Sequence, residues 1–126
     1  MGSETLHAPR ERLKRKTLTL HHAIVSLIEE LEATDWYQQR ADDCEDEALS
    51  EILLHNMREE MEHASMVLEW MRRNSADWDS MLRTYLFTDA PITEIEEEDT
   101  AGGGGEGGSG DAPTAGFTIG TLKKNG

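Results

Sequence analysis

The chain has 126 residues, of which 26 are Asp or Glu and 12 are Lys or Arg, so its formal net charge is −14. This length holds one small folded domain and excludes a two-domain enzyme. The acidic balance argues against nucleic acid or an anionic membrane surface as partner and makes cations the natural counterpart. Cys44 is the only cysteine, which excludes an intrachain disulfide and favours a reducing compartment.

The apolar runs of the sequence are short. The first sixteen residues are charged and lack the apolar core of a signal peptide, while the best apolar run, 23–28, is interrupted by Ser26 and far too short to span a bilayer. We therefore expect a cytoplasmic protein without a membrane partner.

Two long helices are expected in the first part of the chain. From about 10 to 40, apolar residues recur at helical spacing without an internal Gly or Pro. The acidic cluster at 42–46 breaks this pattern, and its charges suit both a turn and the positive N-terminal end of a following helix. A second helix is predicted over about 45–73, ending in basic residues that suit its negative end. Together they predict an antiparallel two-helix hairpin.

A third, shorter helix is predicted over about 76–87, with Ser75 as its N-cap and Pro91 beyond its end. The three helices hold nearly all the large apolar side chains, and a core of this size is marginal. We therefore expect an all-α protein whose copies associate to bury more apolar surface.

The composition changes twice after the helices. Residues 94–116 pass from a run of acids into a Gly-rich stretch, which predicts a disordered linker because it cannot bury enough area to fold. The chain is thus expected to divide into a helical domain, 1–93, this linker, and a C-terminal peptide, 117–126, that docks on a partner. The large apolar residues of that peptide are Phe117, Ile119 and Leu122.

Three ligand-type side chains fall on the apolar faces of the two long helices. Glu60 and His63 lie within the apolar stripe of the second helix, and Glu30 lies on or beside the buried face of the first. An ionised carboxylate in such a place needs a counter-charge, a hydrogen-bond network or a metal ion. Because positions 30 and 60 are equally far from the turn, the two glutamates stand at about the same height and can converge on one ion.

Glu and His donors together suit iron, manganese or zinc and are poor for calcium. Di-iron carboxylate bundles use a Glu from each of two helices and a Glu-x-x-His from each of the other two. This chain has half of that set, so two hairpins paired about a two-fold axis would complete a two-metal site. The alternative is that Glu60 and His63 form an ion pair, Glu30 bridges to a neighbour, and the hairpin is a non-catalytic adaptor or structural interaction module.

Other residues with metal-binding chemistry have weaker patterns. His21 and His22 lie where surface histidines are common, and His55 is more often a structural histidine. Four methionines of the second helix are interpreted as core and interface filler, because the site already has harder ligands. They are Met57, Met61, Met66 and Met71.

At these motifs the chain resembles the encapsulated ferritins, the ferritin-like cargo proteins of encapsulin nanocompartments. The likeness covers about residues 18–96 and includes Glu29-Glu30-Leu31-Glu32-Ala33-x-Asp35-Trp36-Tyr37, Glu59-Glu60-x-Glu62-His63-Ala64 and Leu82-Arg83-Thr84-Tyr85-Leu86-Phe87-Thr88. Residues 117–122, Phe-Thr-Ile-Gly-Thr-Leu, are similar to the Leu-Thr-Ile-Gly-Ser-Leu type of peptide that docks cargo inside the shell.

The resemblance implies a ferroxidase that binds two iron(II) ions between paired protomers and passes their electrons to dioxygen. The pair would form a ferritin-like four-helix bundle. Glu30, Glu60 and His63 match the family's metal ligands, with Glu60 bridging the ions. Iron is the implied metal, and Zn, Mn or Ca are able to occupy such sites in crystals.

Further residues and the cellular setting follow from the same resemblance. Tyr37, grouped with the catalytic residues, and Trp36 match aromatics close to the site, and Glu29 and Glu32 match an acidic entry site for iron. The family assembles as an open ring of five dimers, a homodecamer. It lies inside an encapsulin shell that stores the iron, and the C-terminal peptide is its contact with the shell protein.

Overall fold

The computed structural model describes residues 5–100, in which four α-helices and no strand are found. The chain divides between Asn74 and Ser75 into two compact units. The all-α fold class is as predicted. None of the described helices is long and apolar enough to cross a membrane.

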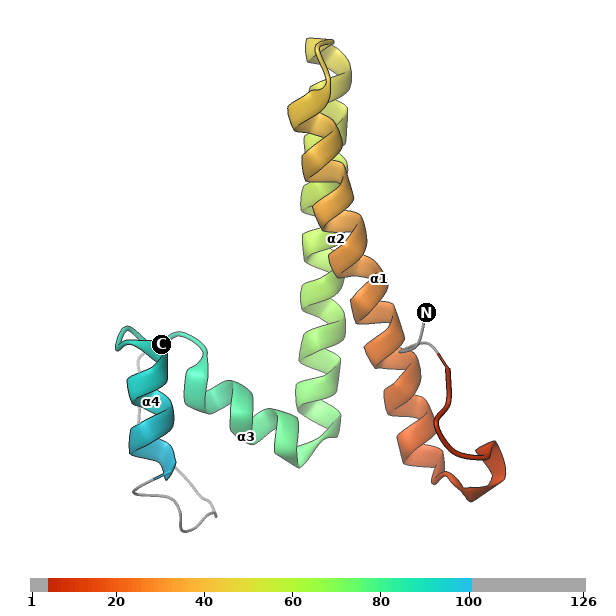
Figure 1. The fold of residues 1–126 in the computed structure, drawn as a ribbon, viewed down its shortest axis with the longest axis vertical. Helices are drawn as coiled ribbons and strands as arrows, with labels where there is room; N and C mark the ends of the chain where they lie inside the picture. The colour runs from red at the N-terminus through yellow and green to blue at the C-terminus, as the bar shows by residue number, and fades with distance from the viewer. Residues whose placement is uncertain (1–4, 101–126) are drawn as a thin grey trace. The chain divides into compact units, whose positions relative to one another are not determined.

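The first unit is an antiparallel hairpin of α1, Arg15–Asp43, and α2, Glu47–Asn74. The two helices run side by side (Figure 1). The predicted first helix began near residue 10, but Arg10–Arg12 form a short 3₁₀ turn after Pro9, and α1 begins three residues later. Pro9 fixes its own φ, and the extended Leu13 separates the turn from the helix.

Side chains at the tight turn hold the ends of the two helices together. The Asp46 carboxylate accepts a hydrogen bond from the backbone N–H of Leu49 at 2.8 Å, which caps the start of α2. The Ser50 hydroxyl donates to the carbonyl oxygen of Ala41 at 3.1 Å, which ties the first turn of α2 to the last turn of α1. The prediction of a turn within 42–46 is confirmed.

The core between the two helices is narrow. Its buried residues are Ala41, Met57, Ala64 and Met71. Many large apolar side chains of the hairpin are half exposed instead, which agrees with the expectation that a single copy has a marginal core. They are Leu31, Trp36, Leu49, Ile52, Met61, Met66 and Trp70.

The second unit contains α3, Ala76–Tyr85, and α4, Ile92–Glu98. Ser75 caps α3 as predicted, because its hydroxyl accepts from the backbone N–H of Trp78 at 3.2 Å. Phe87, just after α3, has a positive φ of 61° and its side chain is 97% exposed. Neither helix contains a fully buried residue.

Helix α4 corrects the prediction that the disordered linker begins at 94. Pro91 is its N-cap, where a missing N–H is harmless, and its carbonyl oxygen accepts from the backbone N–H of Ile95 at 3.2 Å. Glutamates are good helix formers, and Glu94 lies in the favourable first turn. The rest of the predicted linker beyond 100, and the docking peptide 117–126, lie outside the described residues.

Candidate metal centre

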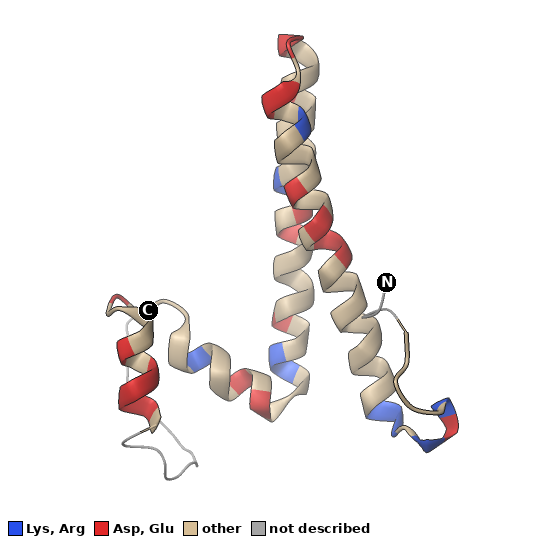
Figure 2. Cartoon of the chain, viewed as in Figure 1, with Lys and Arg blue, Asp and Glu red and all other residues tan. Residues whose placement is uncertain are grey.

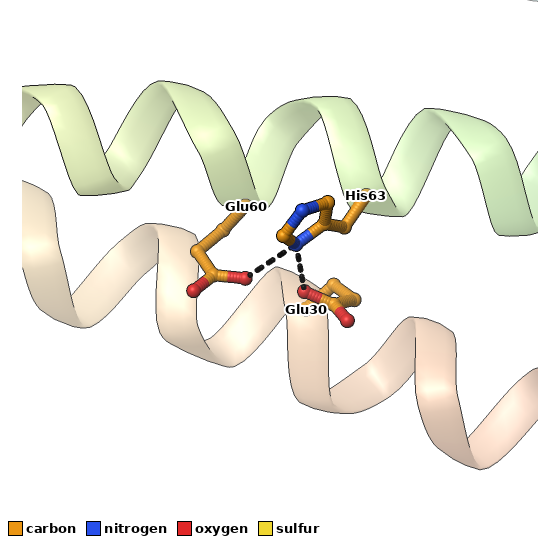
Figure 3. Close-up of side chains that lie close together, drawn as sticks. All are labelled: Glu30, Glu60 and His63. Carbon is orange, nitrogen blue, oxygen red and sulfur yellow. Dashed lines mark hydrogen bonds and ion pairs between the residues drawn. The ribbon is translucent and has the colours of Figure 1, made fainter.

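The middle of the hairpin carries the three ligand-type side chains that the sequence singled out. Glu30 comes from α1, while Glu60 and His63 are one turn apart on α2, and Figure 3 shows all three side chains converging between the helices. The spacing of three residues places Glu60 and His63 on the same side of α2. The structure therefore brings the three residues together, as the equal distance of 30 and 60 from the turn predicted.

The distances within this group are short. His63 Nδ1 lies 3.5 Å from Glu30 Oε1 and 3.3 Å from Glu60 Oε1. One ligand atom from each of the three residues can be chosen so that all lie within 4.8 Å of one another. Among the described residues no other group of His, Cys, Asp and Glu meets this condition.

Each member of the group changes the protonation of the others. The hydrogen bond between the two carboxyl groups, with partial burial, raises the pKa of Glu30. The same hydrogen bond and the contact with His63 lower the pKa of Glu60. Hydrogen bonding to Glu60, together with the nearby charge of Glu30, raises the pKa of His63 above its usual 6.5. The three side chains therefore form one electrostatically linked group.

The group is open on one side. The side chains of Glu30, Glu60 and His63 are 27%, 23% and 45% exposed, so an incoming ion or a second protein surface can reach them. Two carboxylates and an imidazole fit iron, manganese or zinc by donor type. Three protein ligands leave positions open for water, substrate or ligands from another chain. The residues present therefore fit one half of a two-metal centre.

The other predicted site residues of the described chain all lie on α1. Tyr37 is half-buried on α1, and the Arg40 guanidinium carbon lies 5.4 Å from the centre of its ring. Trp36 is 50% exposed, and Glu29 and Glu32 are exposed. None of these four joins the ligand group. The predicted docking residues lie outside the described part of the chain; they are Phe117, Ile119 and Leu122.

The three weaker histidine candidates remain outside the group as well. His55 lies 3.7 Å from Glu59 on the exposed side of α2. The rings of His21 and His22 are 6.1 Å apart on α1. Of the four methionines interpreted as filler, Met57 and Met71 are buried, whereas Met61 and Met66 are 49% and 62% exposed.

A second charged cluster on α2 was missed by the sequence reasoning. The Glu69 carboxylate accepts hydrogen bonds from Arg72 Nε at 2.9 Å, from Arg72 Nη2 at 2.8 Å and from Arg73 Nε at 2.7 Å. These contacts lower the pKa of Glu69 to about 2. The sequence did carry a signal for this cluster. Arg72 and Arg73 follow Glu69 by three and four residues, the spacing at which side chains of one helix meet.

An open apolar groove was also missed. Its volume is about 410 Å³, and it lies between α1 and α2, farther from the turn than Glu30, Glu60 and His63. Small residues of α1, Ala23 and Ser26, face large residues of α2 across it, Met66 and Trp70. The sequence gives the position of each of these residues along its helix. It does not give which small residues of α1 lie opposite which large residues of α2, and the groove depends on that pairing.

Comparisons with known proteins agree on one group. The model of the EncFtn-like family matches residues 5–89 of this chain. A protein of Rhodospirillum rubrum named "Encapsulated ferritin-like protein" is 54% identical over 126 residues, which cover 97% of this chain and 90% of that protein. A "Ferritin-like protein" of Thermotoga maritima is 52% identical over 106 residues, covering 84% of this chain and 93% of that protein.

A solved structure is similar as well. The crystal structure of a Nitrosomonas europaea protein matches with a TM-score of 0.66 and 49% sequence identity. The match covers 69% of this chain and 96% of that one. The similarity thus extends from sequence to three-dimensional fold.

Proposed function

Because the chain belongs to the EncFtn-like family, we propose that it is a ferroxidase that oxidises iron(II) with dioxygen as the cargo of an encapsulin shell. Iron is the substrate in this proposal. Each iron(II) gives up one electron. Dioxygen takes two electrons from one iron pair and two protons from the solvent to give hydrogen peroxide, or four electrons from two pairs and four protons from the solvent to give two water molecules. The family name and the relatives' names support the ferritin-like and encapsulated parts of the proposal.

The observation that carries the proposal is the convergence of Glu30, Glu60 and His63 in the middle of the hairpin. Carboxylate and imidazole donors are the ligands of di-iron carboxylate centres, and one hairpin supplies half of the usual set. A second hairpin related by a two-fold axis doubles each residue, so that two ions would be held by four glutamates and two histidines. The partial exposure of the three side chains is consistent with such a pairing.

The residues of this chain have distinct roles in the proposal. Glu60 would reach both ions, Glu30 and His63 would hold one ion each, and ion binding would compete with protons for these side chains. Tyr37, held beneath Arg40 on α1, borders the site with Trp36. The exposed carboxylates of Glu29 and Glu32 attract the incoming cation.

The proposed setting follows from the family and from the composition. Paired hairpins assemble further into a ring-shaped homodecamer, and residues 117–126 bind the shell protein, which places the oxidation inside a cytoplasmic nanocompartment. A long Gly-rich linker lets the peptide reach the shell without constraining the helical part. Deleting 117–126 should therefore prevent packaging but leave oxidation unchanged, and continued loading into the shell would count against this docking role.

Anaerobic addition of iron(II) followed by air tests the enzymatic proposal. The wild-type protein should develop a ferric absorbance in a fast phase, and Glu60→Ala or His63→Ala should remove that phase. Wild-type rates in these variants would contradict the proposal. Leu49→Ala is a matched control, since it removes an exposed side chain of the same helix far from the ligands.

A second candidate function is a metal-free adaptor that carries other cargo into the shell. It is favoured by the contacts of His63 with both Glu30 and Glu60, because these three side chains already pair with one another without a metal. Native mass spectrometry separates the two functions. An even-numbered oligomer that gains iron supports the ferroxidase, whereas an oligomer of unchanged mass after iron addition supports the adaptor.

A further inference from the structure

The bases of the chain are unevenly distributed along the sequence. Residues 1–28 have a formal net charge of +3, whereas residues 29–126 have one of −17. Five of the 12 bases lie within residues 10–16, and no acid occurs between Glu11 and Glu29. We call residues 10–16 the basic segment; its bases are Arg10, Arg12, Lys14, Arg15 and Lys16. Figure 2 shows these bases gathered where α1 begins, while acids lie at the middle of α1 and at the turn.

The backbone of the basic segment turns its charged side chains to solvent. Arg10–Arg12 form the 3₁₀ turn, Leu13 and Lys14 are extended, and α1 begins at Arg15. Leu13 is half-buried, whereas all five bases are exposed. The segment therefore shields part of its apolar residue and leaves every positive charge accessible to a dissolved anion.

The five bases are not matched by acids of the described chain. None of them forms an ion pair or a side-chain hydrogen bond with another residue of 5–100. Bases of the later helices do have such partners, since Arg73 pairs with Glu69 and Arg83 with Asp79. In those helices an acid lies three or four residues before the base, the spacing at which helical side chains meet. Such acids are almost absent around the basic segment, where Glu11 is the only one.

The position of the bases is also unfavourable for α1. Lys14 is the N-cap and makes no side-chain capping hydrogen bond, and the first turn of the helix has no acid. The N-terminal end of a helix is electrically positive, so that acids stabilise it and bases do not. Helix formation therefore gives no reason for bases at 14–16, and an anion from outside would relieve the repulsion among them.

The residue types favour phosphate as this anion. Three of the five bases are arginines, whose planar guanidinium binds phosphate through two parallel hydrogen bonds. Residues 5–28 contain no Phe, Tyr or Trp on which the bases of a single-stranded nucleic acid would stack. The recognition that remains is that of charge and of the phosphate group itself.

The acidity of the rest of the chain favours a short anion. Glu29 is thirteen residues beyond Lys16, about 20 Å along α1. The Debye length at physiological ionic strength is about 8 Å, so an anion confined to the basic segment is screened from that acid and those beyond it. A long polyanion would extend beside these acids and be repelled by them.

From these observations we propose that the basic segment binds inorganic phosphate, as single anions or as short chains. The binding goes beyond the proposed function, but its use rests on that function. Iron(III) combines readily with phosphate, and Arg15 is fifteen residues from Glu30, about 22 Å along α1. A ferroxidase with this segment would hold the counter-ion of its product close to the site of oxidation.

Isothermal titration calorimetry of the full chain, with chelator and without iron, tests the proposal. The wild-type protein is titrated with orthophosphate and with tripolyphosphate. Arg12→Gln and Arg15→Gln should each lower the affinity several-fold, and together by at least about tenfold, because each removes a charged donor. Replacing both residues by Lys should keep most of the affinity. Circular dichroism checks that the variants retain the wild-type helix content.

Arg58→Gln is the matched control. Arg58 is an exposed base of α2 without an ion pair among the described residues, so its removal changes the net charge equally. Its affinity for both anions should equal that of the wild type. The same loss in Arg58→Gln as in Arg15→Gln would overturn the proposal, because net charge alone would then explain the binding.

The two anions distinguish the sources of the phosphate. Tighter binding of tripolyphosphate identifies chains as the ligand, and equal binding identifies the single anion; both results support the proposal. Absence of binding with both anions would overturn it, as would tighter binding of a DNA duplex. Because no iron is present, the titration does not depend on the ferroxidase. Phosphate binding by a chain that fails to oxidise iron would remove the use with iron(III) and leave the binding surface in place.

Discussion

The hairpin of α1 and α2 carries two charged clusters of three residues, which differ in how well their acids are matched by bases. Glu69 accepts three hydrogen bonds from Arg72 and Arg73, so its one carboxylate is matched by two bases. The group of Glu30, Glu60 and His63 has two carboxyl groups for one imidazole, so its acids outnumber its bases. Both clusters are partly exposed, but only the group of Glu30, Glu60 and His63 has more acids than bases.

The difference separates a structural ion pair from a site. A cluster whose acids are matched by bases of the same chain gains little from a further cation. A cluster with excess carboxylate oxygens, drawn from two helices and open on one side, gains affinity for a cation or for donors of another molecule. Charge matching within the cluster is therefore more informative than exposure alone.

The largest expected effect is the loss of metal binding when a ligand is removed. Glu60→Gln should lower the affinity for iron(II) or zinc(II) by more than about 100-fold, since changing even outer-shell partners of metal ligands costs 10–100-fold. Glu69→Gln, the same chemical change nine residues further along α2, should leave the affinity unchanged. Isothermal titration calorimetry with zinc(II) measures both. Equal losses in the two variants would mean that general acidity, and not the cluster, attracts the metal.

The second effect is stabilisation of the hairpin by bound metal. A free metal concentration 100-fold above Kd adds about 2.7 kcal/mol of stability, which for a domain of this size raises Tm on the order of 10 °C. The rise should be absent in His63→Ala and retained in Arg73→Ala. Circular dichroism melts with zinc(II) or with chelator measure it. A wild-type Tm that is the same with zinc(II) and with chelator would contradict a metal site at this position.

The site was more predictable from the sequence than its surroundings. Glu30, Glu60 and His63 could be grouped because helical spacing fixes which residues share a face and the turn fixes the height at which two helices face each other. The groove could not be predicted, since it depends on which small residues of α1 lie opposite Met66 and Trp70. Helix α4 was missed because composition predicted disorder, whereas capping by Pro91 and the high helix propensity of Glu favour a local helix.

A smaller effect concerns the metal-free protein at neutral pH. His63 has a raised pKa in the folded state, so it contributes stability that is full below about pH 6.5 and is lost as the pH rises through the folded value. With chelator present, the wild-type Tm should therefore fall modestly from pH 6 to pH 8 relative to His63→Gln. Both variants are melted in the same buffers. Parallel pH profiles would show that the imidazole is not paired with the carboxylates in solution.

The smallest effect comes from the matched cluster and has the opposite sign. The pKa of Glu69 is lowered to about 2 from 4.5, so its contribution to stability is present above pH 4.5 and is lost as the pH falls toward 2. Glu69→Gln should lower Tm slightly at pH 7 and should flatten the acid limb of the profile, with no change between pH 6 and pH 8. Because all three side chains of this cluster are partly exposed, salt should weaken the effect. An acid limb that Glu69→Gln leaves unchanged would mean that the hydrogen bonds to Arg72 and Arg73 are replaced by water in solution, and the contrast between the two clusters would then rest on the metal ligands alone.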